Sequence, residues 1–114
     1  MSDCLFCKIR DGQIPAELIY SDECCLAFSD IHPAAPVHAL IIPREHIATL
    51  NDLDPDRAAA LGPLLAAVPR VAQALGVSES GYRLVANCNA DGGQVVYHLH
   101  FHLLGGRALG WPPG

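Results

Sequence analysis

Residues 98–104, HLHFHLL, place a histidine at every second position with a large apolar residue between each pair. Successive side chains of a strand point to opposite faces, so this alternation predicts a strand with His98, His100 and His102 on one face. At a rise of about 3.3 Å per residue, neighbouring rings lie about 6.5–7 Å apart along the backbone, near enough to surround one small anion or metal ion. The alternative is a half-exposed strand whose polar face happens to be histidine. Because a core strand has no need of three imidazoles, we expect function on this face.

Length and composition predict one globular domain over residues 1–114. Hydrophobic residues make up 51% of the chain and charged residues 17%, which suits a folded body better than a disordered one. The formal net charge of -5 argues against nucleic acid as the main partner, although a single nucleotide needs only local donors. The N-terminus lacks a secretory pattern, and no apolar run approaches the roughly 18 residues of a membrane span. We therefore expect a cytoplasmic protein with no membrane partner.

The spacing of apolar and turn residues predicts an α+β domain. A short helix is expected over residues 4–11, capped by Ser2 or Asp3. A longer helix over residues 54–76 contains two prolines off its apolar stripe, so a kinked or divided helix is expected. Strands are expected over residues 18–20, 24–28, 38–42, 82–89 and 95–104. The sequence thus predicts an antiparallel sheet of about five strands, a short N-terminal helix and one longer helix.

These features together resemble the histidine triad (HIT) family, whose motif is His, apolar, His, apolar, His, apolar, apolar. The resemblance extends to CLFCKI at residues 4–9, APVH at 35–38, IPREH at 42–46, DGGQ at 91–94 and WPPG at 111–114. The last two segments point to the Hint branch. The resemblance implies a single histidine triad domain and a homodimer that binds purine nucleotides. It further implies hydrolysis of purine nucleoside 5′-phosphoramidates, and of related adenylates, through a covalent nucleotidyl-histidine with no cofactor required.

His100, the middle histidine of the triad, is the candidate nucleophile. Neutral imidazole is a competent nucleophile near pH 7 because its ordinary pKa is about 6.5. His98 and His102 flank it on the expected strand face. By the family pattern, His102 and His38 help to bind the phosphate or to manage protons, and the sequence does not divide these roles. The alternative for His38 is a hydrogen-bonded histidine of the core.

The remaining nucleotide contacts follow from the resemblance and from side-chain chemistry. Asp30 is placed on the ribose, because a carboxylate accepts two hydroxyl hydrogen bonds; the alternative is a carboxylate that caps a turn. Glycines such as Gly93 let backbone N–H groups approach a phosphate closely, although a hairpin turn needs the same residues. The other expected contacts are Phe6, Ile9, Ile31 and Leu40 around the base and Asn87, Gln94 and Val95 near the phosphate.

Val95 departs from the Hint pattern, which usually has serine at this position. A hydroxyl there would donate to the phosphate or to the leaving group, whereas valine has no donor. The loss of a hydrogen bond to a charged group is worth about 1.5–3 kcal/mol, or roughly one to two orders of magnitude in rate. We therefore expect slower or altered handling of the leaving group rather than an inactive protein.

Cys4 and Cys7 form a Cys-x-x-Cys pair, which suggests two metal ligands on one short turn. The resemblance carries over a Cys-Cys-His-His arrangement that some family members use, completed here by His46 and His98. Such a tetrahedral zinc site would be structural and would fix the ring of His98 beside the nucleophile. The alternative is a metal-free protein in which both cysteines are small, partly buried apolar residues.

Three other functions remain open on the sequence. A dinucleoside polyphosphate hydrolase or nucleotidyltransferase of the same family would share the first chemical step. A nucleotide-binding or interaction module with weak catalysis is kept open by Val95. A histidine-rich metal carrier would bind metal at the triad itself, which suits the interposed apolar residues and the Gly-Gly loop poorly.

Overall fold

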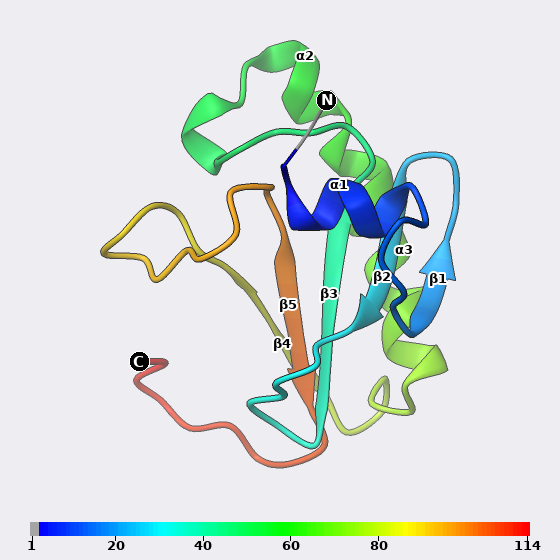
Figure 1. Ribbon diagram of the computed structural model, residues 1–114. Coiled ribbons are helices and arrows are strands. Elements are labelled where there is room, and N and C mark those ends of the chain that lie inside the picture. The colour runs from blue at the N-terminus through cyan, green and yellow to red at the C-terminus, as the bar shows by residue number, and fades with distance from the viewer. Residues whose placement is uncertain (1–2) are drawn as a thin grey trace.

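A computed structural model describes residues 3–114 and arranges them as one sheet between helices (Figure 1). The strands are β1 (Leu18–Ser21), β2 (Cys25–Ser29), β3 (Val37–Pro43), β4 (Tyr82–Ala86) and β5 (Phe101–Gly105). The helices are α1 (Leu5–Arg10), the 3-10 turn η1 (Leu50–Asp52), α2 (Pro55–Ala59) and α3 (Leu61–Ala74). All strand pairs are antiparallel in the order β1-β2-β3-β5-β4. The predicted fold class is confirmed.

The sheet has an apolar layer on each face because residues of β2 and β3 alternate between two clusters. Ala27 and Ile41 pack with Leu64, Val68 and Val71 of α3 on one face. On the other face the cluster contains Phe6 of α1 with Leu26, Phe28, Leu40 and Ile42. Leu40 pairs with His102, so His102 and His38 share the face that α1 partly covers. Strand periodicity thus directs both histidines to the side of the sheet away from α3.

The long helical segment is divided, as expected from its prolines. Asp54 caps α2 by accepting a hydrogen bond from the N–H of Arg57, with Pro55 at the first helical position. The helix is interrupted at Ala60, three residues before Pro63. Pro69 lies inside α3 and faces solvent. The apolar face of α3 therefore stays continuous against the sheet.

Two strands are shorter than the sequence predicts, β4 at its C-terminal end and β5 at its N-terminal end. β4 ends at Ala86 rather than residue 89, and β5 begins at Phe101 rather than residue 95. On β3, Ile41 pairs with Phe101, and two residues farther along stands Pro43, which has no N–H for the ladder. The N–H of Leu99 instead donates to the carbonyl of Ile47 at 2.6 Å. Residues 87–100 therefore form an irregular segment, and only His102 of the triad lies within a strand.

The cap of α1 also differs from the prediction. Cys4 occupies the N-cap and its Sγ accepts a hydrogen bond from the N–H of Cys7 at 3.4 Å, so Asp3 lies before the cap. The alternative cap, Ser2, lies outside the described residues. Across residues 3–114, none of the helices has the length and apolar character needed to cross a membrane.

Candidate active site

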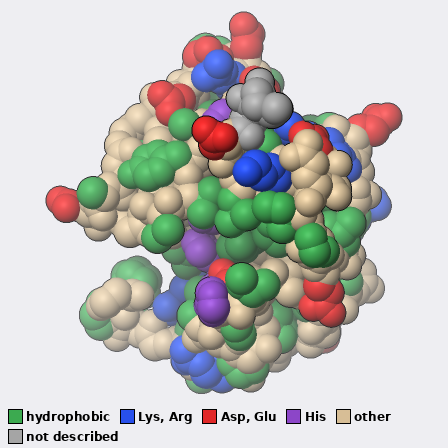
Figure 2. Space-filling model, in the orientation of Figure 1, with side chains coloured by type: hydrophobic (Ala, Val, Ile, Leu, Met, Phe, Trp, Pro, Cys, Tyr) green, Lys and Arg blue, Asp and Glu red, His purple; other side chains and the backbone are tan. Residues whose placement is uncertain are grey.

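A pocket of about 420 Å³ opens between α1, the loop after β2 and the irregular segment before β5. Figure 2 shows histidine side chains in and beside a hollow that is bordered by hydrophobic side chains. Nine of the predicted site residues line this pocket: Phe6, Ile9, Asp30, Ile31, Leu40, Gly93, Val95, His100 and His102. Its size suits a small organic ligand, and its wall is largely apolar with a few polar side chains, among them Asp30, His100 and His102.

The ring of His100 is fixed in one tautomer by the backbone. Its Nδ1 lies 2.8 Å from the carbonyl oxygen of His98, and a carbonyl only accepts, so Nδ1 carries the proton. Nε2 therefore holds a lone pair. Within residues 3–114 every fully buried side-chain nitrogen or oxygen has a hydrogen-bond partner. In that part of the chain Nε2 of His100 has no such partner, so it is not fully buried, and the residue lines the pocket. This arrangement presents a nucleophilic nitrogen to a ligand.

His38 and His102 form a hydrogen-bonded pair with a defined direction. Nδ1 of His38 accepts from the N–H of Ala34 at 2.9 Å, which places the proton of the neutral ring on Nε2. That Nε2–H donates to Nδ1 of His102 at 2.9 Å. The proton of neutral His102 then sits on its Nε2. Because His102 lines the pocket and His38 does not, the pair can present one N–H donor to a bound anion.

Burial keeps these rings neutral at physiological pH. It lowers the pKa of His102 to about 4, with nearby His100 and His38 acting in the same direction. Burial also lowers the pKa of His100 and of His38, against the opposing attraction of the Asp30 carboxylate. A neutral imidazole is the form that can attack an electrophile. The pocket therefore keeps the candidate nucleophile in its reactive state.

Residues 87–97 form a tight loop held by two amide side chains. Gln94 is buried; its Nε2 donates to the carbonyls of Ala48 and Val96, and its Oε1 accepts from the N–H of Asn89. Asn87 donates to the carbonyl of Gly92. A Cβ at Gly92 would lie 2.5 Å from the carbonyl oxygen of Cys88, so only glycine fits there. Neither Gln94 nor Asn87 lines the pocket, and their expected nucleotide contacts stay predictions.

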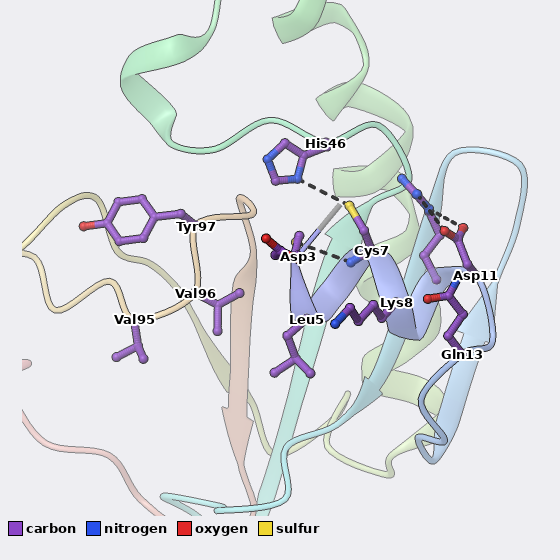
Figure 3. Close-up of a pocket in the computed structure, with 12 residues that line it drawn as sticks. Asp3, Leu5, Cys7, Lys8, Asp11, Gln13, His46, Val95, Val96 and Tyr97 are labelled. Atoms are coloured by element: carbon purple, nitrogen blue, oxygen red, sulfur yellow. Dashed lines mark hydrogen bonds and ion pairs between the residues drawn. The ribbon is translucent and has the colours of Figure 1, made fainter. Parts of the chain in front are cut away.

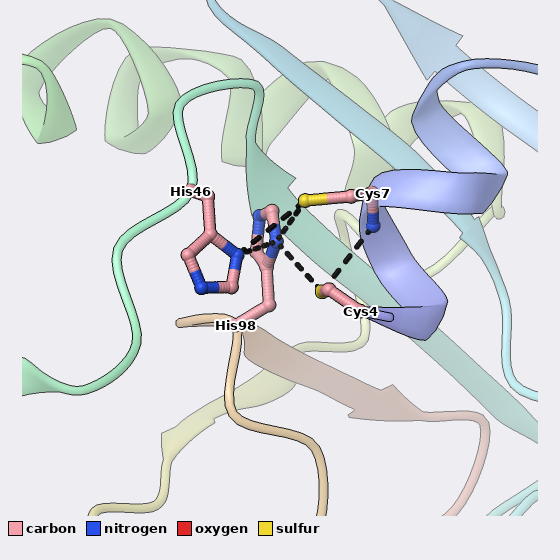
Figure 4. Close-up of side chains that lie close together, drawn as sticks. All are labelled: Cys4, Cys7, His46 and His98. Carbon is pink, nitrogen blue, oxygen red and sulfur yellow. Dashed lines mark hydrogen bonds between the residues drawn. The ribbon is translucent and has the colours of Figure 1, made fainter. Parts of the chain in front are cut away.

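The ring of His98, like that of His100, packs against Phe6 of α1, with centroids 6.1 and 5.0 Å from the Phe6 ring. It is fully buried, and its Nε2 lies 2.9 Å from the carbonyl oxygen of Pro43, so its lone pair is on Nδ1. That Nδ1 faces Cys4 Sγ at 3.4 Å, Cys7 Sγ at 3.5 Å and His46 Nδ1 at 3.2 Å (Figure 4). The predicted strand does not reach His98, since β5 begins at Phe101, and the expected role of its ring beside His100 stays a prediction.

Sγ of Cys4 and Cys7 and Nδ1 of His46 and His98 could together hold a metal ion. They lie within 4.8 Å of one another, and two thiols with two imidazoles are a donor set that suits zinc. A tetrahedral zinc centre implies about 3.3 Å between two nitrogens and about 3.6 Å between nitrogen and sulfur. The observed distances of 3.2, 3.4 and 3.5 Å fit those edges. The two cysteines and two histidines therefore fit a zinc ion.

A second, larger cavity of about 950 Å³ runs beside α1 (Figure 3). It shares Leu5, Val95 and Val96 with the first pocket and continues past Lys8 and Tyr97. Val95 is 86% exposed and stands at this junction. A ligand seated on His100 can thus extend beyond the first pocket along α1.

Sequence reasoning missed several residues of the pocket wall. They are Leu5, Ile14, Pro15, Ala16, Phe28, Ser29, His32 and Val96. Phe28 could have been found, because period-2 alternation places it on the same face as Leu26 and opposite Leu40. Val96 and His32 lie in irregular segments whose side chains follow no periodic rule.

Comparison with known proteins identifies the class of this fold and site. The model of the HIT domain family matches residues 11–109. The chain belongs to the HIT family. It is 47% identical over 106 residues to a purine nucleoside phosphoramidase of Escherichia coli, covering 93% of this chain and 89% of that protein. It is 52% identical over 112 residues to an uncharacterized HIT-like protein of Synechococcus elongatus, covering 98% and 97% of the two chains. A crystal structure of a HIT family hydrolase from Legionella pneumophila has a TM-score of 0.94 at 56% identity, covering 98% of this chain and 100% of that one.

Proposed function

We propose that this chain hydrolyses purine nucleoside 5′-phosphoramidates through a covalent nucleotidyl intermediate on His100. The observation that carries the proposal is the tautomer of His100, whose proton is held at the carbonyl of His98 while the Nε2 lone pair opens to the pocket. The name of the Escherichia coli relative, a purine nucleoside phosphoramidase, supports the same substrate class. The Legionella pneumophila neighbour is described as a hydrolase.

The reaction takes place in two displacements at the α-phosphorus. In the first, His100 Nε2 forms a bond to phosphorus, the bond from phosphorus to the leaving nitrogen breaks, and that nitrogen takes a proton from solvent. In the second, water attacks phosphorus, the bond to His100 breaks, and the proton of the water returns to solvent. The N–H of His102 donates to a phosphate oxygen and stabilises the charge that develops there. The net products are a nucleoside monophosphate and an amine.

The remaining pocket residues supply binding. Phe6, Ile9, Ile31 and Leu40 offer apolar surface to the base, and Asp30 also lines the pocket, where its carboxylate can accept from ribose hydroxyls. Phe6 also packs edge-on against the ring of His100 with centroids 5.0 Å apart. Base binding and nucleophile orientation are therefore served by the same side chain.

Turnover of a small substrate panel tests the proposal. Adenosine and guanosine 5′-phosphoramidates and a dinucleoside polyphosphate would be compared, with the reaction quenched early and the protein digested for mass spectrometry. We expect fastest turnover of the phosphoramidates and a nucleotidyl adduct on the peptide that contains His100. Faster cleavage of the dinucleotide would favour the polyphosphate hydrolase alternative, and tight binding with no adduct would favour a binding module.

We further propose that Cys4, Cys7, His46 and His98 hold a structural zinc ion. Zinc would use all four protein ligands and leave no open position for substrate, so its contribution would be to tie α1 to the segment before β5. The carbonyl of Pro43 already orients His98 for this role. Elemental analysis of protein purified without chelator tests it, and less than about half an equivalent of zinc per chain would refute it.

A homodimer completes the proposal. β4 stands at the edge of the sheet, where its outer backbone groups are available for pairing with another strand. Trp111 in the C-terminal tail is 83% exposed, and a second copy would give it cover. Light scattering during size-exclusion chromatography measures the mass directly, and a mass of one chain at micromolar concentration would rule the dimer out.

A further inference from the structure

The carboxylate of Asp30 lies against the histidine pair as well as in the pocket. Its Oδ2 is 3.4 Å from Nε2 of His38, and its Oδ1 accepts from the N–H of His32 at 2.8 Å. The side chain of Asp30 is 19% exposed and that of His38 only 6%. The contact between carboxylate and ring is thus sheltered from solvent, where electrostatic interactions are stronger than at the surface.

Nε2 of His38 is the atom on which the hydrogen-bonded pair depends. Its proton is shared between Nδ1 of His102 at 2.9 Å and the Asp30 carboxylate at 3.4 Å. The opposite edge of His38 is held by the N–H of Ala34, so the ring has a fixed donor on one side and a negative charge on the other. Without that charge the hydrogen bond from His38 to His102 would remain, but the orientation of the His38 ring would be less strongly fixed.

Among residues 3–114, the carboxylate that the structure places against the pair is that of Asp30. His38 faces Asp30 and His102, and His102 faces His38 and His100, with ring centroids 5.2 and 5.0 Å apart. Asp30 raises the pKa of both His38 and His102 against the stronger lowering by burial. Among the charged groups that act on His38, the Asp30 carboxylate alone favours a positive ring.

We propose that Asp30 is a positioning residue for the His38–His102 pair, and that it acts on their shared proton whether or not a ribose is bound. This inference rests on the proposed function and adds a second role to the ribose contact expected for Asp30. The carboxylate keeps the proton-bearing edge of His38 turned toward His102, and His102 therefore keeps its own N–H toward the phosphate. Binding of the sugar and orientation of the phosphate donor then depend on one side chain.

A substrate without ribose hydroxyls separates the two roles. Wild type and Asp30→Asn would be compared on adenosine 5′-phosphoramidate and on its 2′,3′-dideoxy counterpart, with kcat and KM measured separately. A residue that only binds ribose affects KM for the first substrate and leaves the dideoxy substrate unchanged. We expect Asp30→Asn to lower kcat about tenfold on the dideoxy substrate as well. Equal kcat for wild type and variant on that substrate would overturn the inference.

Asp56→Asn is the matched control, since it removes the same charge from an exposed position of α2, whereas Asp30 lies against His38. It should leave both substrates unaffected, and the circular dichroism of Asp30→Asn should match that of wild type. If wild type turns over neither phosphoramidate, the proposed function fails rather than this inference.

Nuclear magnetic resonance of the histidine rings provides a readout independent of turnover. In the ligand-free protein, the pKa values of His38 and His102 should fall further when Asp30 is replaced by Asn, because the charge that favours protonation is gone. Unchanged titration of both rings in Asp30→Asn would contradict the proposal even if the activities differed.

Discussion

His98 and His100 are two residues apart, yet they belong to two different sites. Each donates one ring N–H to a backbone carbonyl, Pro43 for His98 and His98 itself for His100. Each is thereby left with one lone pair of known direction. The lone pair of His98 faces two thiols and His46, whereas His100 lines the pocket of about 420 Å³. Backbone carbonyls therefore decide which nitrogen is available, and the neighbouring side chains decide what it can bind.

The comparison predicts that loss of His100 removes catalysis and leaves the cysteine–histidine cluster intact. His100→Ala should reduce turnover of adenosine 5′-phosphoramidate at least a thousandfold, because its neighbour His102 presents an N–H rather than a lone pair and cannot replace it. Its zinc content should equal that of wild type. Steady-state kinetics and elemental analysis on one preparation measure both. A loss of less than a hundredfold would exclude His100 as the nucleophile.

The reverse experiment disrupts the cysteine–histidine cluster and leaves His100 in place. Cys7→Ser, or treatment with a strong chelator, should lower the melting temperature by about 10 °C, since the cluster ties α1 to the segment before β5. Cys24→Ser is the matched control, because Cys24 is exposed and lies outside the cluster. Differential scanning calorimetry with and without added zinc gives the measurement. An unchanged melting temperature in Cys7→Ser would show that the four residues hold no stabilising ion.

Sequence reasoning succeeded where a local rule applies. Asp54 and Pro55 mark a helix start, and the alternation of β2 and β3 assigns the two faces of the sheet. The apolar wall residues that were predicted came from the family pattern alone, since a residue such as Leu40 looks the same in a core and in a binding site. The expected lengths of β4 and β5 failed because strand pairing is lost beside Pro43, a partner some sixty residues away in the sequence.

The irregular backbone at His98 and His100 could not be predicted by periodicity. Periodicity places both residues in a strand, whereas here the contacts of Leu99 with Ile47 and of His98 with Pro43 replace strand pairing. The rings of His98 and His100 still both lie against Phe6. The motif therefore identified the chemistry of the segment more reliably than its conformation. The four metal-ligand candidates, in contrast, were all brought together as the resemblance implied.

Val95 offers a smaller test at the junction of the two cavities. Val95→Ser adds a donor where the pocket and the second cavity meet, and we expect kcat/KM for an adenosine phosphoramidate to rise about tenfold. Val95→Ala controls for the change in size. If serine brings no gain over alanine, the backbone of the loop already supplies the hydrogen bond to the leaving group.

The smallest expected effect concerns stability at acid pH. The pKa of His102 is lowered to about 4 in the fold, whereas the unfolded chain binds that proton below about 6.5. The unfolded state therefore holds more protons between these values, and stability falls as the pH drops from about 6.5 to about 4. His102→Gln should remove part of this loss, about 1 kcal/mol once solvent screening of the partly exposed ring is allowed for. Urea unfolding at pH 7 and pH 4.5 measures it, with His32→Gln as an exposed control. An identical pH dependence in wild type and His102→Gln would mean that the ring is already charged in the folded pocket.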